Sequence, residues 1–276
     1  MSTPVSPAAL MPDVRRVVAE AARFLRAHLG RVSEGDIERK DLNSLVSYVD
    51  QTAEAQLVEG LAPLLPTAGF LTEEGTVIQL ETEYRWVIDP LDGTTNFLHQ
   101  LPCFSVSVAL ERHRQPILGV VHEVVGDECF YATRGGGTFL NGEPVRVSDR
   151  PRLADSLLAT GFPYTDFTQF DEYLEVFTHF ARHSRGLRRF GSAAIDLAYT
   201  AAGRFDAFFE QGINRWDIAA GVLLVEEAGG QVMDYHGGSR HLDGAQVLAG
   251  NAAVVAEMRP VLARAYPKIG GKGGSA

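Results

Sequence analysis

The sequence predicts a layered α+β fold, and three observations support this class. The first half holds two segments of helical spacing followed by consecutive strand-like runs, whereas the second half alternates single strands with helices. The 276 residues, 45% hydrophobic and 22% charged, suffice for a large core and are typical of a globular protein. This composition excludes a disordered chain, a collagen and a small disulfide-rich protein.

The first half predicts two helices and a meandering antiparallel sheet. Apolar residues at helical spacing predict a helix over about 8–29, and four leucines predict a second helix that follows Asp50 and stops near Pro66. β-branched and aromatic runs, separated by turn residues, predict strands that end with a short one after three consecutive glycines. The predicted strands before that glycine turn cover 84–88, 104–110, 117–124 and 128–132.

The second half predicts single strands that alternate with helices. A boundary near Pro151 divides 1–150 from 151–267, although the two parts could share one interface. The tail, 268–276, is too rich in glycine to order itself. The predicted strands are 156–160, 187–190, 205–209, 231–234 and 246–249, and the predicted helices are 170–182, 192–202, 215–228 and a final one from Asn251.

Charge, cysteine content and hydropathy limit the partners and the location. A formal net charge of −10 argues against nucleic acid or an anionic membrane as a general partner. Cys103 and Cys129 are too few for a disulfide framework or a zinc cluster and lie in apolar strand-like runs, which favours reduced core thiols in a cytoplasmic protein. No apolar stretch reaches the roughly 18 residues of a membrane-spanning helix, and the amino end has no basic signal region. We therefore expect a soluble, unprocessed protein.

Two acids directly after a buried strand carry the strongest functional signal. Asp89 and Asp92 stand three residues apart around the stiffening Pro90, so both can point to one centre where a divalent metal ion offsets their repulsion. Gly93 allows a ligand to approach the backbone, and the following amides and the Thr94 hydroxyl offer donors to a phosphate. We favour this interpretation over an acidic surface turn, because such turns seldom follow a five-residue buried strand.

A covalent phosphatase mechanism has no nucleophile at this segment. The stretch from Leu91 to Thr94 is similar to the nucleophile loop of haloacid-dehalogenase-like phosphatases, but Pro90 stands where their attacking Asp would be. Metal ligation therefore explains the two acids better.

The segment Asp89-Pro-Leu-Asp-Gly-Thr-Thr resembles a signature of the inositol monophosphatase family of magnesium-dependent, lithium-sensitive phosphatases. Three further segments match this family in the same order, so the resemblance spans about 39–250. These segments are Leu45–Asp50, Leu71–Gly75 with its Glu73-Glu74 pair, and Ile213–Gly221 with its Trp216-Asp217 pair.

The resemblance implies a layered α/β/α/β/α sandwich of the inositol monophosphatase and fructose-1,6-bisphosphatase type, assembled as a homodimer. It implies one Mg²⁺ bound by Glu73, Asp89 and the Leu91 carbonyl, and a second bound by Asp89, Asp92 and Asp217. Glu73 would hold a looser third ion through water, and Li⁺ would inhibit. Hard oxygen ligands from several segments are those that Mg²⁺ accepts.

Catalytic and substrate-binding residues follow from the same resemblance. Asp50 and Thr94 would orient the attacking water, with Glu73 as the third catalytic residue, and Glu210 would accept hydrogen bonds from substrate hydroxyls. The other implied substrate contacts are Asp92, Gly93, Thr94, Gly191, Ser192 and Ala193. Apart from the resemblance, Ser192 is a good N-cap for the following helix. We interpret the basic run 182–189 as a solvated loop or a subunit interface, although a second substrate phosphate could use it.

The predicted activity is hydrolysis of a small phosphorylated polyol or sugar, with myo-inositol 1-phosphate as the leading substrate. Fructose 1,6-bisphosphate and 3'-phosphoadenosine 5'-phosphate remain alternatives, because they share the metal site and differ only in the outer pocket. A regulatory partner protein that kept the fold is disfavoured, since it would not need mutually repelling acids. A nucleotide-binding module lacks a Walker-type glycine-rich loop with lysine.

Overall fold

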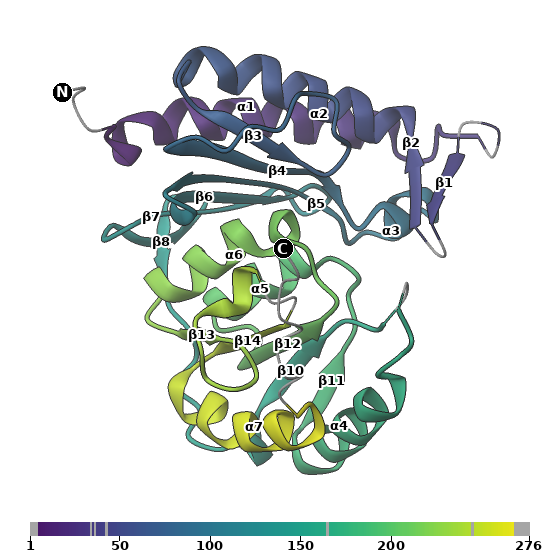
Figure 1. Cartoon of the computed structure of the whole chain (residues 1–276), viewed down its shortest axis with the longest axis vertical. Helices are drawn as coiled ribbons and strands as arrows, with labels where there is room; N and C mark the ends of the chain where they lie inside the picture. The colour runs from purple at the N-terminus through teal and green to yellow at the C-terminus, as the bar shows by residue number, and fades with distance from the viewer. Residues whose placement is uncertain are drawn as a thin grey trace, which may run out of the picture.

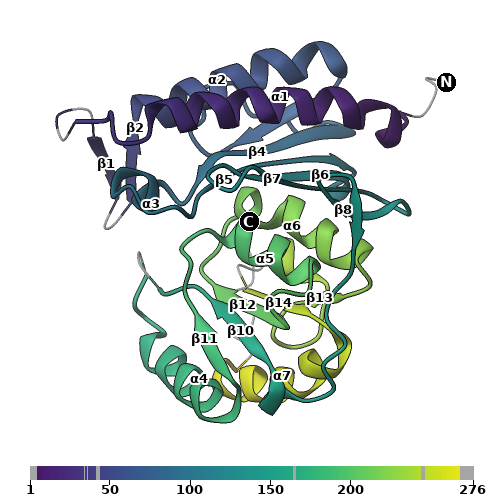
Figure 2. The same cartoon turned by 180° about the vertical axis from the view of Figure 1, so that it is seen from behind.

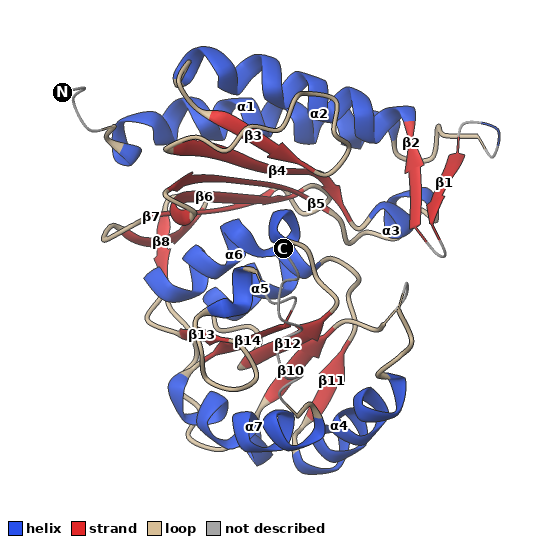
Figure 3. Ribbon diagram, in the orientation of Figure 1, coloured by secondary structure: helices blue, strands red, loops and turns tan. Residues whose placement is uncertain are grey.

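The computed structural model describes residues 5–33, 35, 37–41, 44–163, 166–243 and 246–267. Its elements form five layers, in which a helix pair, a seven-stranded sheet, a helix pair, a five-stranded sheet and a third helix pair follow one another (Figure 1; Figure 3). The predicted α/β/α/β/α sandwich is therefore confirmed. The glycine-rich tail, 268–276, lies outside the described residues. Within the described ranges, no helix combines the length and apolarity needed to cross a bilayer.

Two long helices cover the outer face of the larger sheet (Figure 2). The first, α1 (Pro7–His28), buries an apolar stripe against the sheet. The second, α2 (Tyr48–Leu61), starts earlier than predicted, because the Ser47 hydroxyl accepts from the Val49 amide and caps it. Asp50 consequently lies in the first turn of α2 and not before it. An antiparallel strand pair that the sequence does not predict, β1 (Ile37–Asp41) and β2 (Ser44–Ser47), precedes α2.

The larger sheet is the predicted antiparallel meander with one parallel strand, β3 (Gly69–Thr72), added at its edge. Trp86 and Ile88 pack under α1 and α2, whereas Val87 points to the middle layer. Burial of both faces explains why these strands are almost continuously apolar. The meander consists of β4 (Tyr84–Asp92), β5 (Ser105–Arg112), β6 (Gln115–Glu123), β7 (Glu128–Thr133), β8 (Gly137–Leu140) and β9 (Glu143–Val145).

The middle layer, α5 (Ala193–Ala201) and α6 (Arg215–Glu227), packs against both sheets. Leu197 and Ile218 share one buried cluster with residues of the larger sheet. Gly221 allows the two helices to cross closely, because a Cβ atom there would lie 2.5 Å from the Cβ of Leu197. The small residues of the Trp-Asp segment are thus explained by packing.

The smaller sheet has the strand order β11-β10-β12-β14-β13, with β10 parallel to both of its neighbours. Helices α4 and α7 cover its outer face and bury Val176, Phe180 and Met258. These elements are β10 (Leu157–Thr160), α4 (Phe170–His183), β11 (Gly186–Arg188), β12 (Ala207–Gln211), β13 (Gln231–Met233), β14 (Gln246–Gly250) and α7 (Ala252–Ala265).

Two strands extend beyond the apolar runs that predict them. β4 continues to Asp92 and β12 to Gln211, so Asp89 and Glu210 lie within strands and not after them. The reason is pairing, because Asp92 is still in register with Ser105 and Gln211 with Gln246. Backbone ladders carry a strand past the end of its hydrophobic pattern.

The two cysteines differ in their surroundings. Both are free thiols, and Cys129 is buried in β7 as predicted. Cys103 is partly exposed and precedes β5, so its placement in a core strand is wrong. The loop between the short helix α3 (Thr94–Leu98) and β5 ends one residue after Cys103, where Phe104 takes the buried position.

Candidate active site

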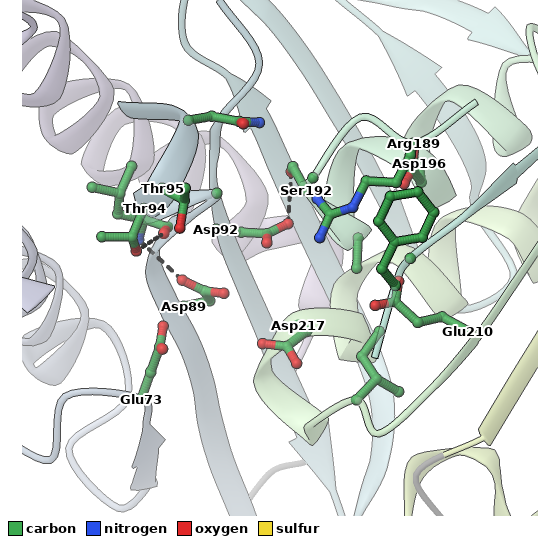
Figure 4. Close-up of a pocket in the computed structure, with 18 of the residues that line it drawn as sticks. Glu73, Asp89, Asp92, Thr94, Thr95, Arg189, Ser192, Asp196, Glu210 and Asp217 are labelled. Carbon is green, nitrogen blue, oxygen red and sulfur yellow. Dashed lines mark hydrogen bonds between the residues drawn. The ribbon is translucent and has the colours of Figure 1, made fainter. Parts of the chain in front are cut away.

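A cavity of about 740 Å³ lies between the end of β4 and the second half of the chain (Figure 4). Every predicted site residue except Asp50 lines this cavity, and so do further residues that the predicted site does not include. The predicted residues in its lining are Glu73, Asp89, Leu91, Asp92, Gly93, Thr94, Gly191, Ser192, Ala193, Glu210 and Asp217, and the additional ones include Gly161, Phe162, Arg189 and Asp196.

A β-bulge turns Asp89 and Asp92 toward the same side of β4. Residues three positions apart in a regular strand face opposite sides of the sheet. Here Asp89 is in register with Ser107 and Asp92 with Ser105, so β4 advances by one residue more than β5 and the alternation is shifted. The Leu91 amide donates to Asp89 Oδ1 at 3.0 Å and fixes the bulge.

Gly93 joins β4 to the short helix α3 (Thr94–Leu98) in a left-handed conformation, with φ of 98°. A Cβ atom at this position would lie 3.0 Å from the carbonyl oxygen of Cys103 and 3.2 Å from that of Gly191. Both the backbone angle and the close approach therefore require glycine.

Asp50 lies behind the cavity wall and holds Thr94. The Thr94 hydroxyl lies 3.1 Å from Asp50 Oδ1 and 3.0 Å from the Leu91 carbonyl oxygen, and it can donate to either. The other oxygen of Asp50 accepts from the amide and the hydroxyl of Ser47, each at 2.8 Å. Burial raises the pKa of Asp50 above its usual value, and the Ser47 and Thr94 hydrogen bonds oppose this shift.

The loop that carries Glu73 is anchored by Glu54, a fully buried residue of α2 that lies outside the predicted site. Glu54 accepts from the amides of Glu74 and Thr76 at 2.7 and 2.8 Å, and from the Thr76 hydroxyl at 2.6 Å. Gly75 between them adopts φ of 64°, which suits glycine. The sequence signal for Glu54 is an acid on the apolar stripe that contains Leu57 and Leu61.

Asp217 enters the cavity from the first turn of α6, where it accepts from the Asn214 amide at 2.7 Å. The start of this helix is fixed by Arg215, whose guanidinium pairs with the buried Glu111 at 2.7 Å. Glu111 also pairs with Arg85 of β4 at 2.9 Å. This network ties the helix that carries Asp217 to the strand that carries Asp89.

Asp92 connects the two halves of the chain. Its Oδ2 accepts from the Ser192 hydroxyl at 2.6 Å and from the Ala194 amide at 2.7 Å, at the start of α5. Burial raises the pKa of Asp92 to about 6, and these hydrogen bonds oppose the shift. Ser192 also accepts from the Ile195 amide, which confirms it as the N-cap of α5.

Burial and mutual repulsion disfavour the ionised form of the carboxyl groups in the cavity, and a nearby positive charge would stabilise that form. Burial first, and then the charges of Glu73, Asp92 and Asp217, raise the pKa of Asp89 well above its usual value. Burial first, and then Asp92 and Glu73, do the same to Asp217. Arg189 is the one cationic side chain among the described residues of the lining. Buried carboxylates are retained when cations compensate them.

This donor set suits a hard divalent cation, because it offers carboxylate oxygens and one carbonyl oxygen from separate segments. Within the described part of the chain, no group of three or more His, Cys, Asp or Glu side chains lies close enough together to hold a metal ion as the side chains stand. The fit therefore rests on the donor chemistry and on the shared cavity.

The opposite wall of the cavity holds Glu210, Asp196 and Arg189. Glu210 packs against Gly161, where a Cβ atom would overlap its carboxyl group at 1.9 Å. Burial raises the pKa of Glu210 to about 8. Arg189 ends the basic run 182–189 and is exposed, as a solvated run predicts, but its side chain also lines the cavity, where the alternative of a second substrate phosphate would place it (Figure 4). Its guanidinium lies 5.4 Å from the centre of the Phe162 ring.

Comparison with known proteins identifies the family. A model of the inositol monophosphatase family matches residues 11–268. The chain is 41% identical over 260 residues to an inositol-1-monophosphatase of Rhizobium meliloti, covering 94% of this chain and 98% of that protein. It is 43% identical over 241 residues to a protein of Pseudomonas aeruginosa named Nus factor SuhB, covering 86% and 89%.

A solved structure agrees with the sequence comparison. The extragenic suppressor protein SuhB of Bartonella henselae superposes with a TM-score of 0.88 at 40% identity, covering 92% of this chain and 98% of that one. Family model, sequence relatives and solved structure all extend over nearly the whole chain. The chain therefore belongs to the inositol monophosphatase family.

Proposed function

We propose that this protein is a Mg²⁺-dependent phosphomonoesterase that hydrolyses a small phosphorylated polyol, with myo-inositol 1-phosphate as the leading substrate. The observation that carries the proposal is the meeting of Glu73, Asp89, Asp92 and Asp217 in one cavity, beside the Thr94–Asp50 pair. Family membership supports phosphatase chemistry, and the name of the Rhizobium relative supports the substrate.

Each metal ligand has a stated place in this proposal. Glu73, Asp89 and the Leu91 carbonyl would hold one Mg²⁺, and Asp89, Asp92 and Asp217 a second, with Glu73 reaching a looser third ion through water. When bound, the ions neutralise phosphate oxygens, acidify a water molecule and stabilise the departing alkoxide. Li⁺ is expected to inhibit.

The side chains of this protein orient the reactants. When the Thr94 hydroxyl hydrogen points to Asp50, the oxygen lone pairs of Thr94 are left to accept from an attacking water. The amides of Gly93 and Thr94 would donate to the phosphate, and the segment Gly191–Ala193 together with Glu210 would contact the hydroxyl-bearing ring. Asp92 would serve both the second ion and a substrate hydroxyl. No phosphoenzyme is formed, because water attacks phosphorus directly.

The test is release of inorganic phosphate by the purified full-length protein, with Mg²⁺, with a chelator and with added Li⁺. We expect Mg²⁺-dependent turnover of myo-inositol 1-phosphate that Asp89→Asn abolishes while the melting temperature is retained. The control is Asp13→Asn, an exposed acid of α1, which should match the parent protein. Full activity of Asp89→Asn would refute the proposal.

Arg189 favours a second candidate within the same chemistry. As the cation of the cavity wall, it could pair with a second phosphate, as in fructose 1,6-bisphosphate or 3'-phosphoadenosine 5'-phosphate. The same phosphate-release assay across the three substrates decides between them, and a preference for a bisphosphate that Arg189→Gln removes would favour this candidate.

A non-enzymatic role is the remaining alternative, because relatives of similar identity are named Nus factor SuhB. Identity alone does not separate the two roles. The buried acids of the cavity favour the enzyme, since they cost folding free energy that a binding protein need not spend. We also propose that the protein is cytoplasmic and that it forms a homodimer. Light scattering of the purified protein tests the homodimer.

A further inference from the structure

Asp196 is a buried acid of the cavity wall with an unused hydrogen-bonding atom. It lies in the first turn of α5, its side chain lines the cavity, and the residue is 1% exposed. Its Oδ1 atom is buried, and among the described residues it has no hydrogen-bond partner. Buried polar atoms are almost always paired in folded proteins, so an unpaired one at a cavity needs an explanation.

Among the described residues, no hydrogen bond uses the Oδ1 atom of Asp196, although the charge of Arg189 acts on this carboxyl group. The N-terminus of α5 is already capped by Ser192, and the carboxylate that receives the Ala194 amide is Asp92. By contrast, the buried Asp206 uses its carboxyl group structurally, because it accepts from the Leu157 amide at 2.7 Å and pairs with Arg150 at 3.3 Å.

The surroundings of Asp196 are suited to hydroxyl groups and not to a second metal cluster. Glu210 and Arg189 line the same wall, and Phe162 stacks beside Arg189. Burial raises the pKa of both carboxyl groups, to about 8 for Glu210, so Glu210 can donate as well as accept a hydrogen bond near neutral pH, and Asp196 offers an acceptor oxygen without a partner. A hydroxyl group is also both donor and acceptor, and a ring with several hydroxyls matches two such carboxyls.

We propose that Asp196 is a substrate-specificity residue, whose unpartnered carboxyl oxygen hydrogen-bonds a ring hydroxyl of the phosphorylated polyol on the wall that it shares with Glu210. This inference rests on the proposed phosphatase function and names a further contact within it. The substrate class it selects is a polyhydroxylated ring, as opposed to a phosphate ester whose alcohol part carries no hydroxyl.

The test compares two substrates on two variants of the full-length protein. Asp196→Ala should lower kcat/KM for myo-inositol 1-phosphate by about 10- to 100-fold, mainly through KM, because a site that pairs with a hydroxyl discriminates strongly. The same variant should hydrolyse phenyl phosphate within about 3-fold of the parent, since no hydroxyl contact is lost. Asp196→Asn keeps an acceptor and a donor and should recover most of the activity on the inositol substrate.

Stability and a matched control separate this role from a structural one. Because Oδ1 is unpaired, Asp196→Ala should melt no lower than the parent. Asp206→Asn, which changes a buried acid outside the cavity, should melt lower and leave the ratio of the two substrates unchanged.

An equal loss of kcat/KM on both substrates, or a failure of Asp196→Ala to fold, would overturn the inference while the proposed function stood. A parent protein that hydrolyses neither ester would overturn both.

Discussion

The Ser192 hydroxyl, at the start of α5, donates to Asp92, at the end of β4, at 2.6 Å. One side chain therefore caps α5 and also stabilises the ionised form of a predicted metal ligand. We expect Ser192→Ala to cost about 1 kcal/mol of stability through the lost cap. The pKa of Asp92 should rise further above about 6, because the hydrogen bond that opposes the effect of burial is removed.

At pH 6.5, Ser192→Ala should therefore need a higher Mg²⁺ concentration than the parent for half-maximal activity, and at pH 8.5 the two proteins should need nearly the same concentration. Mg²⁺ titrations of phosphate release at both pH values check this. Ser192→Thr keeps the hydroxyl and serves as the control. An unchanged Mg²⁺ requirement at pH 6.5 would show that Asp92 does not depend on this bond.

Thr94 and Asp50 provide a test of the catalytic step. Thr94→Val keeps the shape of the side chain but removes the hydroxyl that contacts Asp50 and Leu91. We expect kcat to fall by about 100- to 10,000-fold, in the range of a lost general acid–base contribution, with little change in KM. Thr94→Ser should retain most of the rate. Steady-state kinetics at saturating Mg²⁺ make the measurement, and a change confined to KM would contradict the assigned role.

Glu54 acts at a distance through the loop that carries Glu73. Its carboxylate accepts three hydrogen bonds from Glu74 and Thr76, and a Gln side chain has only one acceptor oxygen. Glu54→Gln should lose about 1–3 kcal/mol of stability and bind Mg²⁺ more weakly, yet approach the parent kcat when Mg²⁺ saturates.

Thermal unfolding and Mg²⁺ titration check this together, with the exposed Glu59→Gln of the same helix as control. A fall in kcat that excess Mg²⁺ does not restore would assign Glu54 to another role.

Glu210 makes the stability of the metal-free protein depend on pH. Burial raises its pKa from 4.5 in the unfolded chain to about 8 in the folded one. Between these values the unfolded state releases the proton and the folded state keeps it, so stability falls as pH rises from about 4.5 to 8. Glu210→Gln should therefore be stabilised relative to the parent by on the order of 1–3 kcal/mol at pH 8 and by little at pH 4.5.

Urea unfolding in a chelator measures this difference. His122 and His241, whose pKa values are lowered by burial, act in the opposite sense below about pH 6.5 and are shared by both proteins. A stability difference that does not vary with pH would mean that Glu210 is ionised in the folded state.

The layers and most of the cavity could be predicted because local patterns encode them. Helical and strand periods locate the elements, and the Asp89-to-Thr95 segment marks the site through an abrupt change from apolar to polar residues. The extent of β4 and β12 could not be predicted, since it depends on pairing with distant strands. The bulge that brings Asp89 and Asp92 to one side has the same origin.

Three residues escaped prediction for different reasons. Glu54 and Asp196 are acids within otherwise apolar helix faces, a signal that indicates burial but not which loop or cavity they face. The basic run 182–189 allows a contact with a second substrate phosphate, but only the path of the chain after β11 shows that Arg189 is the residue of this run that lines the cavity. Long-range placement therefore limits what can be read from the sequence.

The two helices of the middle layer bring to the cavity residues that the first half of the chain lacks. Asp89 and Asp92 arrive with the first half of the chain, whereas Asp217 and the hydroxyl that holds Asp92 arrive with the second. A gene cut near Pro151 would yield two polypeptides, neither of which carries a complete set of acids. Any activity they recovered would depend on their concentrations, because only the reassociated complex would hold all of these acids.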